Sequence, residues 1–99
     1  MKTHVVNIRT HTPTPRDVLI DRRTYFGNPF RIDRGTSRAE AVNKFRVYAA
    51  RQMKVNPAFR RAVLALQGKT LVCHCKPQAC HGDVYLELLK EYDHRGTLV

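Results

Sequence analysis

Two short segments of this 99-residue chain hold the residue types that could do chemistry. The first runs from Cys73 to Asp83, reads Cys-His-Cys-Lys-Pro-Gln-Ala-Cys-His-Gly-Asp and contains all three cysteines. The second is the tetrapeptide Gly27-Asn28-Pro29-Phe30. Thiols, imidazoles and a carboxylate in so short a stretch suit metal binding, nucleophilic chemistry or proton transfer. Three interpretations of the first segment therefore compete.

A zinc site is the first interpretation. Structural zinc takes four ligands from Cys and His, and Cys73, Cys75 and Cys80 could supply three, with His81 or a more distant histidine as the fourth. However, the spacing Cys-x-Cys-x4-Cys-His differs from the usual Cys-x2-Cys pairs, and the chain has no second pair. We therefore predict no stoichiometric zinc and no other cofactor. A small zinc-stabilised nucleic-acid-binding module remains an alternative.

A reactive thiolate is the second interpretation. Cys80 is expected at the start of a helix, where the helix dipole and the nearby Lys76 would lower the pKa of its thiol. His81 and Asp83 could then act as acid or base, so Cys80, His81 and Asp83 are the candidate catalytic residues. The third interpretation is structural. Cys73 is then a small buried side chain, while His81 and Asp83 stabilise a helix start whose N–H groups would still suit a phosphate.

The tetrapeptide has properties expected of a ligand-binding loop. Gly27 permits a close approach of a ligand to the backbone, and Pro29 restricts the turn. Asn28 can donate and accept hydrogen bonds, as a reader of a base or ribose must, and Phe30 could stack on a base. Gly27, Asn28 and Phe30 are therefore candidate ligand contacts. The alternative is a tight turn with Phe30 in the core.

The net charge of +10 belongs to the first two-thirds of the chain. Residues 1–61 hold fourteen Lys or Arg against four Asp or Glu, whereas residues 62–99 hold four of each. Twelve of the eighteen basic residues are Arg, whose planar fork matches phosphate or carboxylate. We expect an anionic partner, with candidate contacts at Arg9, Arg22, Arg23 and Arg38. The alternative is a solvated basic surface.

Three short strands and one long loop position these segments. Strands are expected at residues 4–8, 17–20 and 70–75 from their apolar character and the turn residues that follow them. The last begins with an unbroken apolar run, which is typical of a central, buried strand. Residues 21–35 form an intervening loop of a length that is often functional.

Three helices are expected between and after these strands. Ser37 and Glu40 fit a capping box that starts the first helix. Asn56-Pro57 starts the second, with proline at the first helical position, and Gly68 stops it. The third runs from about Cys80 to Tyr92, with apolar residues on one face.

The order β, β, α, α, β, α predicts an α/β fold in a single domain, residues 1–99, with a small mixed or parallel three-stranded sheet and about three packed helices. Ligands gather at the carboxyl ends of strands in such sheets, which is where the cysteine-rich segment lies. We expect the 21–35 loop to fold over that edge, so that the Gly27–Phe30 loop, with Asn28, and the Cys80–Asp83 helix start form two walls of one pocket. No apolar run reaches the roughly 18 residues of a membrane span, and no P-loop or dinucleotide fingerprint is present.

The combined pattern resembles an uncharacterised family of phages and bacteria, the domain-of-unknown-function family 4326. The matching pieces are Val6-Asn7-Ile8-Arg9, Gly27-Asn28-Pro29-Phe30, Arg38 with Glu40, Leu71-Val72-Cys73-x-Cys75-x-Pro77 and Cys80-His81-Gly82-Asp83-Val84. The resemblance implies that the two segments are a shared signature, and it implies a cytoplasmic location, that of the host if the protein is phage-encoded. The sequence departs from the family pattern at His74, usually a bulky aromatic residue, and at Asp21-Arg22, usually Gly-Arg.

Charge, loop and resemblance together predict a phage or bacterial protein that binds a nucleotide-like or nucleic-acid phosphate and could modify or hydrolyse it. The main alternative is a non-enzymatic phage protein that binds a host protein or sequesters a signalling nucleotide. No membrane partner is expected.

Overall fold

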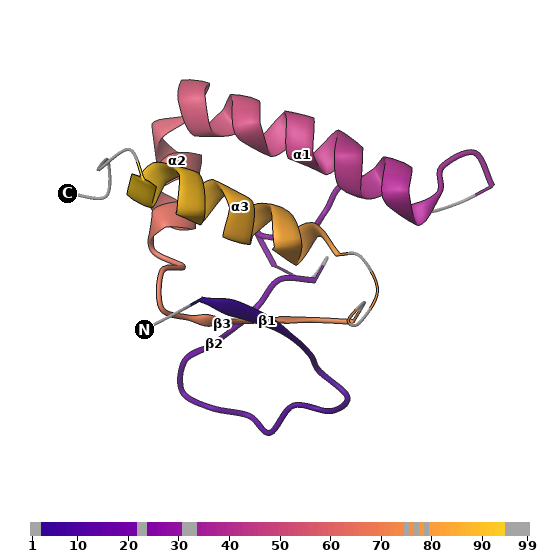
Figure 1. Cartoon of the computed structure of the whole chain (residues 1–99), viewed down its shortest axis with the longest axis vertical. Helices are drawn as coiled ribbons and strands as arrows, with labels where there is room; N and C mark the ends of the chain where they lie inside the picture. The colour runs from indigo at the N-terminus through magenta and orange to yellow at the C-terminus, as the bar shows by residue number, and fades with distance from the viewer. Residues whose placement is uncertain are drawn as a thin grey trace.

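Secondary structure in the computed structural model follows the predicted order of strands and helices (Figure 1). The structure describes residues 3–21, 24–30, 34–74, 76, 78 and 80–94, with the backbone alone at 93–94. Each strand ends one or two residues earlier than predicted, and the last helix begins one residue later. The elements are β1 (His4–Asn7), β2 (Asp17–Leu19), α1 (Arg38–Val55), α2 (Pro57–Leu64), β3 (Thr70–Cys73) and α3 (His81–His94).

The three strands form a parallel sheet with β3 in the centre and β1 and β2 on either side. All four residues of β3 are buried, as the unbroken apolar run predicted. The link from β1 to β2 runs beneath the sheet in Figure 1, on the side opposite the helices. Because all three strands run in one direction, their carboxyl ends meet at one edge of the sheet.

Local caps define where α1 and α2 begin. The hydroxyl of Ser37 accepts a hydrogen bond from the Glu40 amide at 3.2 Å, which confirms the predicted cap. The side chain of Asn56 accepts from the Phe59 amide at 3.1 Å, while its own amide closes α1. Asn56 thus ends one helix and begins the next. The turn that leads to β3 contains Gly68, whose φ of 80° favours glycine.

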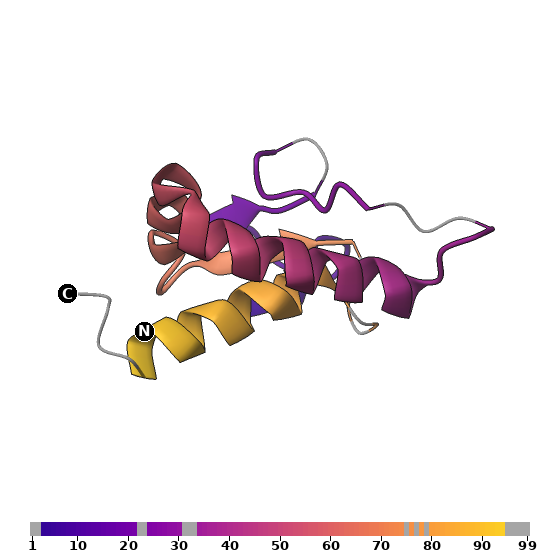
Figure 2. The ribbon, with the colours of Figure 1, turned by 90° about the horizontal axis from the view of Figure 1, so that it is seen from above.

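All three helices pack on the same face of the sheet (Figures 1 and 2). Seen from above, α3 and the loop after β2 lie on opposite sides of α1 (Figure 2). The predicted apolar faces of the helices are buried against β3 and form one core. Its largest fully buried side chains include Tyr85, Phe45, Ile20, Met53 and Leu71.

Within the described ranges, no helix has both the length and the apolar character needed to cross a membrane.

Candidate functional site

The carboxyl edge of the sheet joins β1 to the turn after β3. The Ile8 amide donates to the Cys73 carbonyl at 2.9 Å. Asn7, the last residue of β1, donates from its side chain to the Lys76 carbonyl and accepts from the Arg9 amide at 2.8 Å. Asn7 therefore holds two turns together, a role that its place at a strand end did not reveal in the sequence.

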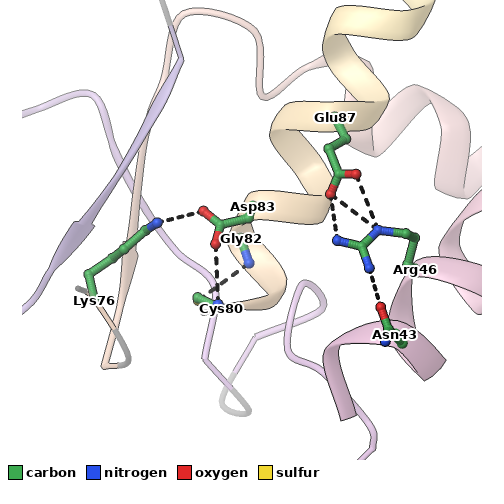
Figure 3. A network of polar contacts seen from close by, with 7 residues as sticks. All are labelled: Asn43, Arg46, Lys76, Cys80, Gly82, Asp83 and Glu87. Carbon is green, nitrogen blue, oxygen red and sulfur yellow. Dashed lines mark hydrogen bonds and ion pairs between the residues drawn. The ribbon is translucent and has the colours of Figure 1, made fainter. Parts of the chain in front are cut away.

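The start of α3 is organised around Asp83 (Figure 3). One carboxylate oxygen lies 2.6 Å from the ammonium nitrogen of Lys76, and the other accepts from the Cys80 amide at 3.3 Å. The hydrogen bond to Asp83 raises the pKa of Lys76, against the opposing effect of partial burial. Asp83 is thus both the cap of α3 and half of an ion pair.

The amides of Gly82 and Asp83 at this helix start also donate within the chain. The Gly82 amide donates to the Cys80 sulfur at 3.3 Å, and the Asp83 amide donates to the Cys80 carbonyl at 3.0 Å. A phosphate bound at this helix start would therefore have to replace acceptors that the protein itself supplies.

His81 is buried and faces the loop that follows β2. Its Nε2 lies 2.6 Å from the Ile20 carbonyl and 3.1 Å from the Phe26 carbonyl. Because carbonyl oxygens only accept hydrogen bonds, Nε2 is the donor and carries a hydrogen. Its Nδ1 lies 3.8 Å from the buried sulfur of Cys80. The candidate catalytic residues Cys80 and His81 are thus neighbours, and His81 spans the gap between α3 and the loop.

Tyr85 supports the same loop carbonyl from the next turn of α3. Its hydroxyl donates to the Phe26 carbonyl at 2.9 Å, and its ring packs edge-on against that of Phe26. Burial raises the pKa of Tyr85 above its ordinary value. Phe26 thus receives two side-chain hydrogen bonds from α3, one from Tyr85 and one from His81. The apolar helix pattern around Tyr85 gave no sign of this polar contact.

Gly82 allows α3 to approach the sheet closely. A Cβ at this position would lie 2.8 Å from the Ile20 Cδ1 atom and 3.0 Å from a Val5 methyl group. Both neighbours are side chains of the packed sheet, so a larger residue would push the helix start outward. Close packing therefore explains why the Cys-His-Gly-Asp sequence has a glycine at position 82.

The tetrapeptide loop is tied to α1. The Asn28 side chain donates to the Ala41 carbonyl at 3.3 Å and accepts from the Phe30 amide at 2.8 Å. Phe30 is half-buried against the core, and its ring lies edge-on to Tyr48 with centroids 6.0 Å apart. The alternative of a turn with Phe30 packed inward thus describes its placement, and Gly27 adjoins these contacts as a half-buried residue.

The two halves of the predicted pocket are bonded to different neighbours. The Asn28 side chain bonds to Ala41 near the start of α1, and Arg38 is the first residue of that helix. Asp83 instead faces Lys76 beside β1 and β3. What connects the tetrapeptide loop to α3 is the Phe26 carbonyl. The shared pocket of Asn28 and Asp83 stays a prediction.

The remaining candidates lie apart or outside the described residues. Arg9 is exposed just after β1, and His74 lies 3.0 Å from an Asp21 carboxylate oxygen. Arg22, Arg23 and Cys75 lie outside the described residues. Among those described, no three His, Cys, Asp or Glu residues are placed to hold a metal ion. The zinc alternative, which needs Cys75, therefore stays a prediction.

Comparison with known proteins agrees with the family resemblance found in the sequence. Over 73 residues the chain is 36% identical to a phage protein, and the match covers 74% of this chain and 67% of the relative. That relative is the "Uncharacterized 12.4 kDa protein in nrdA-td intergenic region" of Enterobacteria phage T4. No solved structure matches. Residues 6–91 match the family described as Domain of unknown function (DUF4326), and the chain belongs to that family.

Proposed function

We propose that this protein binds the phosphate groups of a nucleotide or nucleic acid through the basic side chains of α1 and α2. The observation that carries the proposal is the excess of basic over acidic residues in these two helices. α1 contains five basic residues and one acidic residue, and α2 adds two basic residues and no acidic one. A surface of this kind attracts phosphate and speeds its encounter with the protein.

Several of these charges are available to a ligand. Lys44, Arg51, Lys54 and Arg61 are exposed, and none forms an ion pair with the described part of the chain. Arg46 differs, since its guanidinium lies 2.9 Å from Glu87 on α3 (Figure 3). The hydrogen bond to Glu87 raises the pKa of Arg46. Arg46 is therefore neutralised by α3, whereas Lys44, Arg51, Lys54 and Arg61 are exposed charges without an ion-pair partner among the described residues.

The contacts of the signature residues favour binding over hydrolysis in this proposal. Cys80 and His81 are buried, and the donor nitrogen of His81 is committed to backbone carbonyls. A general acid or base must reach the proton that it transfers. Roles for Cys80, His81 and Asp83 in catalysis remain predictions. We assign His81 to holding the loop in place and Asp83 to capping α3.

The test is a titration with a labelled mononucleotide and with short single- and double-stranded oligonucleotides at two salt concentrations. Affinity for at least one of them should fall steeply as salt rises, because each neutralised phosphate releases bound counterions. Absence of binding to all of them at low salt would contradict the proposal. It would favour the alternative in which the basic side chains of α1 and α2 bind an acidic protein.

A further inference from the structure

Two exposed tyrosines stand beside the basic residues of α1. Tyr25, in the loop after β2, is 61% exposed, and Tyr48, on α1, is 38% exposed. Large aromatic side chains usually bury most of their area, so two partly open rings on one small protein call for an explanation. Together with Lys44 and Arg51 they form what we name the tyrosine surface.

The two rings belong to one patch because they share a neighbour. The centroid of Tyr25 lies 6.1 Å from that of Phe59, and the centroid of Tyr48 lies 6.3 Å from it. The tyrosines are therefore no more than about 12 Å apart, although they come from a loop and a helix. Phe59 itself is buried, so it forms the floor between two rings that reach the solvent.

Both rings are held from behind by the contacts that anchor the loop. Tyr25 packs edge-on against Phe26 with centroids 5.6 Å apart, and the Phe26 carbonyl is gripped by His81 and Tyr85. Tyr48 is held edge-on by Phe30 of the tetrapeptide. The hydrogen bonds from His81 and Tyr85 to the Phe26 carbonyl thus help to fix the position of the aromatic rings outside, which lowers the entropy cost of binding.

Basic residues flank Tyr48 on the same side of the helix. Lys44 lies one turn before Tyr48 and Arg51 one turn after it, so all three side chains line one stripe of α1. Lys44 and Arg51 are exposed and have no ion-pair partner within the described residues. Between Lys44 and Arg51 this stripe holds no acidic side chain, and the exposed Glu40 lies one turn before Lys44.

We propose that the tyrosine surface binds single-stranded nucleic acid, with bases stacked on Tyr25 and Tyr48 and phosphates held by Lys44 and Arg51. Stacking is tolerant of sequence because every base has an aromatic face, and cations beside the rings follow the strand's backbone. In a duplex the base faces are covered by neighbouring pairs, so the tyrosines distinguish single strands from duplexes. This inference rests on the proposed phosphate binding and names its ligand class.

The experiment uses the full chain and fluorescence anisotropy with a labelled oligothymidylate and a duplex of equal length. We expect Tyr25→Ala and Tyr48→Leu each to weaken single-strand binding about tenfold, which corresponds to the loss of one stacked base. Duplex binding should stay within about twofold. Tyr25→Phe and Tyr48→Phe are the matched controls, since they keep the rings and should keep the affinity. Binding of the single strand should also quench tyrosine fluorescence, and this quenching should shrink in Tyr25→Ala.

Charge variants separate this inference from the proposed function. Lys44→Ala and Arg51→Ala should weaken both ligands and lower the salt dependence by about one counterion each. Lys90→Ala, an exposed residue on α3, is the control and should change neither. If wild type binds neither oligonucleotide nor the mononucleotide, the proposed function fails; if it binds the mononucleotide alone, the tyrosine surface is wrong. If both ligands bind equally and the tyrosine variants keep their affinity while the charge variants lose it, phosphate binding stands and the tyrosine surface is wrong. Thermal melting of every variant verifies that it is folded.

Discussion

The carboxyl edge of the sheet and the outer side of α1 differ in how their polar groups are used. At the edge, His81, Asp83 and Asn7 each make at least two hydrogen bonds within the chain. On the outer side, Lys44 and Arg51 have no ion-pair partner within the described residues. The edge holds the Cys-His-Gly-Asp part of the signature, and the helix holds exposed charge without an ion-pair partner among the described residues.

This difference separates two roles that a sequence motif does not distinguish, namely holding the fold together and binding a partner. Residues grouped as Cys-His-Gly-Asp invite a catalytic interpretation, but their neighbours are backbone carbonyls, a lysine and closely packed methyl groups. Surface side chains without a motif are the ones left for a partner. The comparison predicts that changes at the edge alter stability, whereas changes on the helix alter binding.

The largest effect is expected for His81→Ala. It removes a buried ring and leaves the carbonyls of Ile20 and Phe26 with fewer partners, so we expect the free energy of unfolding to fall by about 3 kcal/mol. Urea unfolding measures this change. His74→Ala, which removes a partly exposed contact with the Asp21 carboxylate, is the control and should cost below about 1 kcal/mol. Equal losses for the two histidines would erase the distinction between the edge and the surface.

A smaller loss is expected for Gly82→Ala. The new methyl group would press on Ile20 and Val5, and relief requires the start of α3 to shift, at a cost of about 2 kcal/mol. Thermal denaturation gives the change, and Gly35→Ala, in an exposed turn, provides the comparison. An unchanged melting temperature for Gly82→Ala would mean that the helix start moves freely, and so that the edge is not rigid.

Tyr85→Phe should cost about 1 kcal/mol near neutral pH, because the Phe26 carbonyl loses one donor. It should also change the alkaline behaviour. The folded protein holds the pKa of Tyr85 above its ordinary value of 10.0, so the stabilising contribution is complete below pH 10 and is lost as the pH rises toward the folded pKa. Wild type should therefore lose stability above pH 10 more steeply than Tyr85→Phe. If the free energies of unfolding of wild type and Tyr85→Phe changed in parallel with pH from pH 9 upward, the burial of the Tyr85 phenol would be contradicted.

The smallest effect on stability is expected on the outer side of α1. Arg51→Gln removes an exposed charge that has no ion-pair partner among the described residues, so the free energy of unfolding should change by no more than about 0.5 kcal/mol. The same variant should weaken oligonucleotide binding at low salt. A large loss of stability together with unchanged binding would reverse the assignment of the two regions.

Local patterns were sufficient to predict the elements of this fold. The cap at Ser37 and the Asn56-Pro57 pair act within one helical turn, so their effect is visible in a few residues of sequence. The unbroken apolar run of β3 likewise indicated a strand buried on both faces. The strand ends were less accurate, since a strand stops where its neighbours stop pairing, and that depends on other parts of the chain.

The order of the elements, the central strand, the family signature and the excess of positive charge could thus be predicted from local patterns and composition. Which residues meet in space depends on the tertiary structure. The Phe26 carbonyl is bonded by His81 and Tyr85, which lie 55 and 59 residues further along the chain, and Tyr25 and Tyr48 both pack against Phe59. Such contacts have no local pattern, because they arise from packing three helices on one face of a parallel sheet, and packing depends on shape and volume rather than on spacing in the sequence.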